Sequence, residues 1–377
     1  MRIRHTLSID LQCKVCDGVE AVVNKNERVC MGLQSGLEKI VASESRKKGC
    51  EEVVLGVWEN GEFCFAGAGH WKGLEVGPET PFLIASTSKL FITTLLFQLV
   101  EAGQLSLEAR VVEFFEGELD RLHVFRGCDY TPQITVGHLV THTSGLPDYF
   151  EGKRSDGSCL ASELFEGVDQ AFNLEDVVRW TGREMSPAFA PGMEGRALYA
   201  DTNFYLLSEL LCRATGKRLQ EMLVDQITDR LGLSCTRFFE PGVEAMPLRR
   251  GAQVLEIPKA LASMPGDGGM VSTLADLIEF GRAFFDGRLF SKGLLDDSPP
   301  WRRVFFPLRA GTGVLRFALP QWLPPFKSGM EFLGHSGITG AFLFAFPKGG
   351  RILGGTVNQL EGRSRCYQMM VKAALAS

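Results

Sequence analysis

The chain has 377 residues, of which 45% are hydrophobic and 23% are charged, and its formal net charge at pH 7 is −5. This composition is typical of a soluble globular protein and excludes a disordered chain, while the length predicts roughly two folded units. The acidic balance and the lack of a basic stripe exclude nucleic acid as an expected partner, because binding to DNA or RNA depends on Lys and Arg contacts with phosphates.

Residues 1–32 are predicted to be an N-terminal extension, since their apolar positions show little periodicity. They contain no continuous apolar segment followed by a small-residue cleavage site, so we expect a cytoplasmic location. The longest apolar run, Leu90–Val100, is too short to cross a bilayer, and no membrane span is expected. Cys13 and Cys16 form one Cys-x-x-Cys pair without a second pair at zinc-site spacing, so we predict no metal and no cofactor.

The folded part begins with a helix and a hairpin. From Leu33 the apolar positions recur at helical spacing, and Gly49 follows as a stop signal. Two strands, Val53–Trp58 and Phe63–Ala66, then flank Asn60-Gly61, which is a strong signal for a hairpin turn.

The other end of the chain repeats this pattern with a second predicted hairpin, Ala341–Phe346 and Ile352–Val357, and a final amphipathic helix. The middle is mostly helical segments broken by Gly/Pro loops, as in Asn203–Thr215 and Leu219–Leu231. We therefore predict an α/β (α+β) fold, in which an antiparallel sheet built from both chain termini is flanked by helices and carries an inserted, mainly helical region. The predicted units are the extension 1–32, an α/β sheet domain of residues 33–102 and 259–377, and a helical domain of residues 103–258.

Among the motifs that carry chemistry, the chain contains only Ser-x-x-Lys, and it contains that motif twice. Ser45 and Lys48 lie at the polar end of the first predicted helix, where both side chains would be solvated. Ser86 and Lys89 instead open the run 90–100, which is apolar nearly all round and is therefore predicted to be a buried helix.

The spacing of Ser86 and Lys89 places both side chains on one helical face, with Cβ atoms about 5–6 Å apart. A helix N-terminus favours negative charge on the serine oxygen, and its free N–H groups can face an oxyanion. Burial is expected to lower the pKa of Lys89 and to make it a base. The alternative is a serine N-cap followed by an ordinary lysine whose ammonium group reaches solvent.

Two further segments are candidate parts of the same site. Tyr199 is the one tyrosine with an Asx residue two positions on, Asp201, and it precedes an apolar helix; Asp201 is alternatively an N-cap. Glycines in the segment Gly334–Gly340 let a substrate approach the backbone at a strand entrance, and His335 lies there. An acyl substrate could add its own backbone to this sheet edge, although a histidine in such a loop is alternatively an ordinary hydrogen-bonded residue.

The order of these motifs resembles that of the penicillin-binding protein and class C β-lactamase superfamily, which includes D-alanyl-D-alanine carboxypeptidases, D-aminopeptidases and family VIII carboxylesterases. The resemblance covers residues 33–377. The matching segments, in order, are Ser86-x-x-Lys89, Leu139–Pro147, Pro191-Gly192, Tyr199-x-Asp201, Leu231–Leu233, Gly268–Leu277 and His335-Ser336-Gly337.

This resemblance implies a serine hydrolase that works through an acyl-enzyme without a metal. Ser86 would attack the carbonyl carbon, and Lys89 with Tyr199 would transfer the proton. The backbone amides of Ser86 and Ile338 would form the oxyanion hole. The remaining matched residues, namely Asp201, His335, Ser336 and Gly337, would support substrate binding.

Two positions depart from the family pattern. Asp201 stands where the second motif usually has Asn, and a carboxylate beside Lys89 would hold the lysine protonated and shift the role of base to Tyr199. His335 stands where β-lactamases and carboxypeptidases usually have Lys, and a neutral imidazole recognises a substrate carboxylate poorly. Esterase-type members tolerate this change more often.

We therefore expect a carboxylesterase-like enzyme. The alternatives are a β-lactamase, a D-alanyl-D-alanine carboxypeptidase or a D-aminopeptidase, so the expected partner is a small-molecule ester, β-lactam or D-amino-acid peptide. A member of another functional class, a non-catalytic ligand sensor or scaffold, is the remaining alternative. The sequence gives no indication of the oligomeric state.

Overall fold

The computed structural model describes residues 31–296, 301–319 and 329–376, so Cys13, Cys16 and most of the predicted extension lie outside the described residues. Its main feature is an eight-stranded sheet with the strand order β12-β13-β14-β15-β16-β17-β1-β2, in which every neighbouring pair is antiparallel. The strands are β1 (Val53–Glu59), β2 (Glu62–Ala68), β12 (Arg302–Phe305), β13 (Leu308–Ala310), β14 (Leu315–Leu319), β15 (Met330–Ser336), β16 (Phe342–Phe346) and β17 (Arg351–Thr356).

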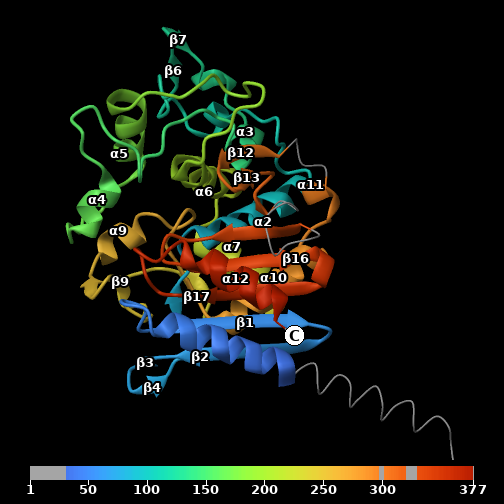
Figure 1. The fold of residues 1–377 in the computed structure, drawn as a ribbon. Coiled ribbons are helices and arrows are strands. Elements are labelled where there is room, and N and C mark those ends of the chain that lie inside the picture. Colours follow the sequence, from blue (N-terminus) through green and yellow to red (C-terminus); the bar gives the residue numbers. More distant parts are fainter. Residues whose placement is uncertain (1–30, 297–300, 320–328, 377) are drawn as a thin grey trace, which may run out of the picture.

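Both predicted hairpins are confirmed. The turn between β1 and β2 places Asn60 at φ 52° and Gly61 at φ 91°, which is the left-handed backbone that a tight hairpin turn requires. The two hairpins meet along β1 and β17, where Val54 lies opposite Thr356. The blue and red strands of Figure 1 therefore lie side by side, and the sheet is built from both ends of the chain, as predicted.

Helices cover both faces of the sheet, because β1 alternates its apolar side chains between two cores. Val53 and Leu55 pack in one core with the helix that includes residues 31–45 and with α12 (Arg365–Leu375). Val54 points to the other core, which α10 (Leu274–Asp286) and α2 (Ser88–Glu101) complete.

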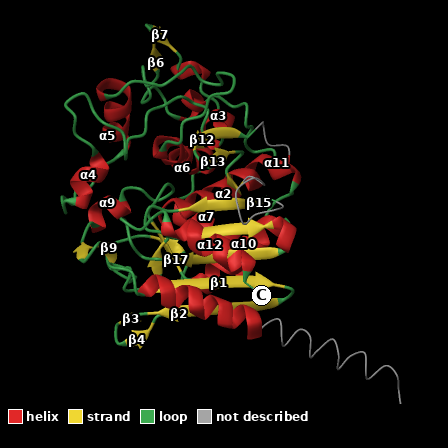
Figure 2. Ribbon diagram, viewed as in Figure 1, coloured by secondary structure: helices red, strands yellow, loops and turns green. Residues whose placement is uncertain are grey.

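The central part of the chain is mainly helical and lies beyond one side of the sheet (Figure 2). Its helices are α3 (Val136–Val140), α4 (Leu160–Phe165), α5 (Leu174–Arg179), α6 (Asp201–Thr215), α7 (Leu219–Leu223), α8 (Asp229–Leu231) and α9 (Pro258–Ala262). A further short helix, α11 (Gly293–Asp296), follows α10 in the chain. Short strands accompany them: β3 (His70–Trp71), β4 (Leu74–Glu75), β5 (Phe82–Leu83), β6 (Val124–Phe125), β7 (Cys128–Asp129), β8 (Arg237–Phe238), β9 (Leu248–Arg250), β10 (Gln253–Leu255) and β11 (Met270–Ser272).

The predicted fold class, with its terminal sheet and inserted helical region, is confirmed, whereas the domain boundaries stay a prediction. Within the three described ranges, the structure contains no helix with the length and apolar character needed to cross a bilayer.

Helix α2 lies between the sheet and the helical region, packed against β15 and α6. All of its residues from Ser88 to Phe97 are buried, which confirms the predicted buried helix. The end of β15 comes so close to the start of this helix that a Cβ on Gly337 would lie 2.6 Å from the backbone oxygen of Ile84. A glycine is therefore needed at this point, and the sequence segments of Ser86 and Gly337 are brought together.

Candidate active site

Ser86 lies in a short 3-10 turn, Ala85–Thr87, that leads directly into α2. Lys89 has no exposed surface, and its Nζ atom lies 3.2 Å from Ser86 Oγ. The prediction that Lys89 is buried beside Ser86 is confirmed, and the alternative of a lysine that reaches solvent is wrong. Ala85 adopts φ 44°, an unfavourable backbone conformation for a residue with a Cβ, of the kind often found at functional sites.

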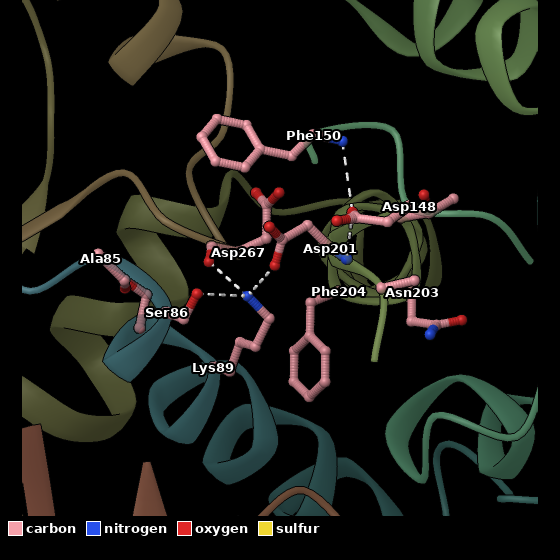
Figure 3. A network of polar contacts seen from close by, with 12 residues as sticks. Ala85, Ser86, Lys89, Asp148, Phe150, Asp201, Asn203, Phe204 and Asp267 are labelled. Carbon is pink, nitrogen blue, oxygen red and sulfur yellow. Dashed lines mark hydrogen bonds and ion pairs between the residues drawn. The ribbon is translucent and has the colours of Figure 1, made fainter. Parts of the chain in front are cut away.

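The Lys89 ammonium group has three oxygen partners, which Figure 3 shows around a single nitrogen. Besides Ser86 Oγ, Nζ donates to Asp201 Oδ1 at 2.6 Å and to the backbone oxygen of Asp267 at 2.5 Å. An ammonium group has three protons, so this arrangement uses its full donor capacity and fixes its position. The serine oxygen is therefore an acceptor from Lys89 in this state.

These contacts contradict the expectation that the pKa of Lys89 is lowered. Burial does lower this pKa, but the charges of Asp201, Tyr199 and Asp267 together outweigh burial and raise the pKa above its ordinary value. The lysine is therefore an ammonium ion at neutral pH. This outcome agrees with the second expectation from the sequence, that Asp201 would hold Lys89 protonated.

The ring of Tyr199 packs against two other aromatic side chains and lies near Lys89. Its ring stacks on His142 at a centroid distance of 4.6 Å, meets Phe305 edge-on at 6.1 Å, and lies 5.3 Å from Lys89 Nζ. Burial and the charge of Asp201 raise the pKa of Tyr199 above its ordinary value, although Lys89 and Ser86 act in the opposite direction. The tyrosine therefore lies beside Lys89 with its hydroxyl protonated at neutral pH.

A hydrogen-bonded chain behind Tyr199 fixes the ring of His142. Its Nδ1 atom accepts from the backbone N–H of Ala200 at 3.3 Å and lies 3.1 Å from Asn203 Nδ2, and Ser144 Oγ donates to Asn203 Oδ1 at 2.6 Å. Burial, followed by the charges of Lys89 and His335, holds the pKa of His142 well below its usual value. A neutral imidazole therefore supports the tyrosine ring, a role that the sequence did not reveal.

Asp201 is the first residue of α6, and the predicted alternative of a side-chain N-cap is wrong. The N-cap residue is Ala200, while the Asp201 carboxylate faces Lys89. The backbone N–H of Asp201 donates to Asp148 Oδ1 at 2.9 Å, so Asp148 supplies the cap from outside the helix. Burial and the charge of Asp201 raise the pKa of Asp148 to about 7.

The Gly334–Gly340 segment divides its side chains between the two faces of the sheet. His335 and Ser336 lie within β15 rather than in the predicted loop. His335 is buried beside Tyr199, with ring centroids 5.9 Å apart, and its Nδ1 atom donates to the backbone oxygen of Ser336 at 2.9 Å. Burial and Lys89 lower the pKa of His335 to about 3, so this imidazole is neutral. The Ser336 hydroxyl instead lies 2.6 Å from the hydroxyl of Tyr367, on α12.

Ser86 and Ile338 both line a small cavity of about 50 Å³. Neither of their backbone N–H groups has a hydrogen-bond partner within the described residues. The other lining residues are mainly apolar, namely Leu83, Ala85, Phe150, Leu164, Phe165, Leu248, Ile257, Leu261, Met264, Gly268, Thr339 and Leu360, together with Asp201 and Asp267. The described residues contain no group of three or more His, Cys, Asp or Glu side chains that could hold a metal ion.

Replacement of Asp201 by Asn is expected to move the acidic limb of the pH–rate profile to lower pH. The carboxylate raises the pKa of both Lys89 and Tyr199, so its removal lowers the pKa of whichever group accepts the serine proton. The profile of kcat/KM against pH, measured with a p-nitrophenyl ester, tests this expectation. An unchanged acidic limb in Asp201→Asn would contradict it.

Comparison with known proteins identifies a family that matches most of the chain. Residues 37–376 match the family model described as Beta-lactamase. Esterase EstB of Burkholderia gladioli is 27% identical over 227 residues, which are 58% of this chain and 55% of that protein. The D-alanyl-D-alanine-carboxypeptidase/endopeptidase AmpH of Escherichia coli (strain K12) is 27% identical over 215 residues, which are 55% of this chain and 50% of that protein. The chain thus spans about half the length of the curated relatives it matches.

A solved structure shows the same fold over nearly the whole chain. The D-stereospecific amidohydrolase from Streptomyces sp. is similar with a TM-score of 0.71 and 23% sequence identity, over 91% of this chain and 98% of that chain.

Proposed function

The chain belongs to the β-lactamase family, whose members are serine hydrolases, and on this premise we propose that it cleaves small carboxylic esters through an acyl-enzyme on Ser86. The observation that carries the proposal is the contact of Ser86 Oγ with a fully buried Lys89, at 3.2 Å, in a cavity lined by Ser86 and Ile338. Similarity to an esterase and to a carboxypeptidase supports acyl transfer as the type of reaction.

In the proposed reaction, Tyr199 acts as a phenolate that has already released its own proton to solvent, a form that its raised pKa makes the minor one at neutral pH. Ser86 Oγ forms a bond to the ester carbonyl carbon and gives its proton to this phenolate. The positive charge of Lys89 stabilises the tyrosine oxygen, and the N–H groups of Ser86 and Ile338 donate to the carbonyl oxygen as it becomes negative. Tyr199 then delivers the proton to the leaving oxygen as the C–O bond breaks. Water attacks the acyl-enzyme by the reverse sequence and releases the carboxylic acid.

The charges around the cavity favour esters over β-lactams and carboxypeptidase substrates. A β-lactam antibiotic and a peptide C-terminus both carry a carboxylate, which needs a cation nearby. The third motif presents the neutral His335, and the lining residues of the cavity include Asp201 and Asp267 but no Lys or Arg. A carboxylate in this position would therefore have no partner of opposite charge among the lining residues.

Parallel assays with p-nitrophenyl butyrate and nitrocefin test the proposal. We expect ester hydrolysis at least about tenfold faster in kcat/KM than nitrocefin hydrolysis, together with a butyryl adduct on Ser86 in the intact mass spectrum. Faster nitrocefin turnover would instead identify a β-lactamase. Failure of both substrates, with no adduct on Ser86, would favour the non-catalytic sensor or scaffold.

A further inference from the structure

The carboxylate of Asp267, near Ser86, has a hydrogen-bond partner at only one of its two oxygens within the described residues. Asp267 is 2% exposed, and its Oδ2 atom accepts a hydrogen bond from the Tyr149 hydroxyl at 2.5 Å. Its Oδ1 atom is buried and has no hydrogen-bond partner within the described residues. A buried carboxylate oxygen without a donor destabilises the folded protein, so a native structure retains one only where something compensates.

The unpartnered oxygen belongs to a residue that lines the cavity containing Ser86. Asp267 and Asp201 both line this cavity with the serine. Figure 3 shows the two carboxylates next to each other, with that of Asp267 directed away from Lys89, toward the side on which Phe150 lies. Lys89 therefore donates to the backbone oxygen of Asp267 and not to its carboxylate.

The charges do not balance in the cluster that Lys89, Asp201 and Asp267 form. Lys89 is the cation of the cluster, and its three protons are already directed at Ser86, Asp201 and the backbone of Asp267. Burial and the charge of Asp201 raise the pKa of Asp267 to about 8, although Lys89 and Tyr149 act in the opposite direction. The ionised form of Asp267 therefore lacks a second cation, which a ligand could supply.

The position of the cluster restricts which cation fits. Ser86 Oγ and Asp201 Oδ1 share Lys89 Nζ as a partner, so they lie no farther apart than two hydrogen-bond lengths. In an α-amino acyl group, the ammonium nitrogen is separated from the carbonyl carbon only by the α-carbon. When Ser86 attacks that carbonyl carbon, an α-ammonium group can therefore reach the adjacent carboxylates. The cluster does not have the donor set of a metal site within the described residues.

We propose that Asp267, together with Asp201, binds the protonated α-amino group of an aminoacyl ester or amide. This inference rests on the proposed function and names the class of acyl group that the same site accepts. The ammonium protons satisfy Asp267 Oδ1, while the apolar lining around Phe150 and Leu164 accepts a small side chain. Asp267 is thus a specificity-determining residue, and it takes no part in proton transfer.

Three benzyl esters that differ only at one α-substituent test the proposal. Alanine (each enantiomer), lactic acid and isobutyric acid place an ammonium, a hydroxyl and a methyl group at the same position. Assays at pH 8 follow the released benzyl alcohol. At this pH about half of Asp267, with its pKa of about 8, is ionised, and an α-amino group with a pKa of about 7.7–8.0 is still partly charged. We expect one alanine enantiomer to exceed both neutral esters by about tenfold or more in kcat/KM, as a hydrogen bond to a charged group provides.

Asp267→Asn should reduce the ratio of kcat/KM between the alanine and isobutyrate esters by about tenfold, since the amide keeps an acceptor for Tyr149 but loses the charge. Asp286→Asn, which removes an exposed carboxylate on α10, should leave the ratio at its wild-type value. An unchanged ratio in Asp267→Asn would overturn the proposal. If that variant does not fold, the wild-type enzyme still decides, because equal kcat/KM for the three esters would equally overturn it. Failure of all three esters and of p-nitrophenyl butyrate would instead overturn the proposed function on which the inference rests.

Discussion

The variant Ser86→Ala is expected to lose ester turnover, with kcat reduced by about 10⁴–10⁶-fold. In the proposed mechanism, Ser86 Oγ forms the acyl bond, and Lys89 and Tyr199 act on the substrate through that oxygen. Initial rates with p-nitrophenyl butyrate and the intact mass after a short incubation measure the loss. The variant should keep its melting temperature within about 2 °C, because Ser86 contributes one hydrogen bond as an acceptor from Lys89.

The chain contains its own control for this experiment. Ser45 has the same Ser-x-x-Lys spelling with Lys48, but its hydroxyl donates to the backbone of Ala42 and Lys48 is exposed. Ser45→Ala should therefore retain wild-type turnover. Ester hydrolysis that persists in Ser86→Ala, or that disappears in Ser45→Ala, would show that Ser86 is not the nucleophile.

Lys89→Met is expected to reduce both turnover and stability. The substitution removes the cation that stabilises the proton-accepting group, so kcat should fall by about 10²–10⁴-fold. It also leaves Asp201 buried without its partner, and breaking a buried ion pair from one side costs about 3–5 kcal/mol of the free energy of unfolding. Lys48→Met, at the exposed position of the second motif, should change neither quantity.

The stability loss in Lys89→Met should depend on pH in a defined direction. The pKa of Asp267 in the folded protein, about 8, lies above its ordinary value, and Lys89 lowers it. The contribution of a raised carboxyl pKa to stability is fully present below the unfolded pKa of about 4 and is lost as the pH rises through the folded pKa. Without Lys89 the folded pKa is higher still, so urea unfolding should show a larger deficit at pH 8 than at pH 5. A deficit that is equal at both pH values would contradict this account of the cluster.

The parts of the fold that could be predicted are those in which local pattern and local structure coincide. Asn60-Gly61 favours a left-handed turn in a hairpin, and the apolar run 90–100 predicts a helix that is buried over most of its length. The Ser86–Lys89 contact could also be predicted from the sequence, because the two residues are three positions apart at the start of one helical segment. These features depend on neighbours in the chain.

The parts that could not be predicted depend on residues far apart in the chain. The sign of the Lys89 pKa shift follows from contacts with Asp201 and Asp267, which are 112 and 178 positions away. Tyr149 meets Asp267 across 118 positions, and no periodicity marks either residue. Ser336 alternates with His335 along β15, so a strand assignment for this segment would have directed the serine hydroxyl away from the nucleophile.

The pairing of β1 with β17 imposes an order on how this molecule is made. A ribosome releases β1, β2 and the Ser86 helix early, yet the edge of β1 opposite β2 has no partner until β17 has emerged almost 300 residues later. Throughout that interval the nascent chain carries an open strand edge, which is a hazard for aggregation and a natural target for chaperones. Ile338 also arrives late, so the oxyanion site proposed above cannot exist before synthesis is nearly finished. The nascent chain therefore carries the proposed nucleophile, Ser86, for most of its synthesis without the Ile338 amide of the proposed oxyanion site.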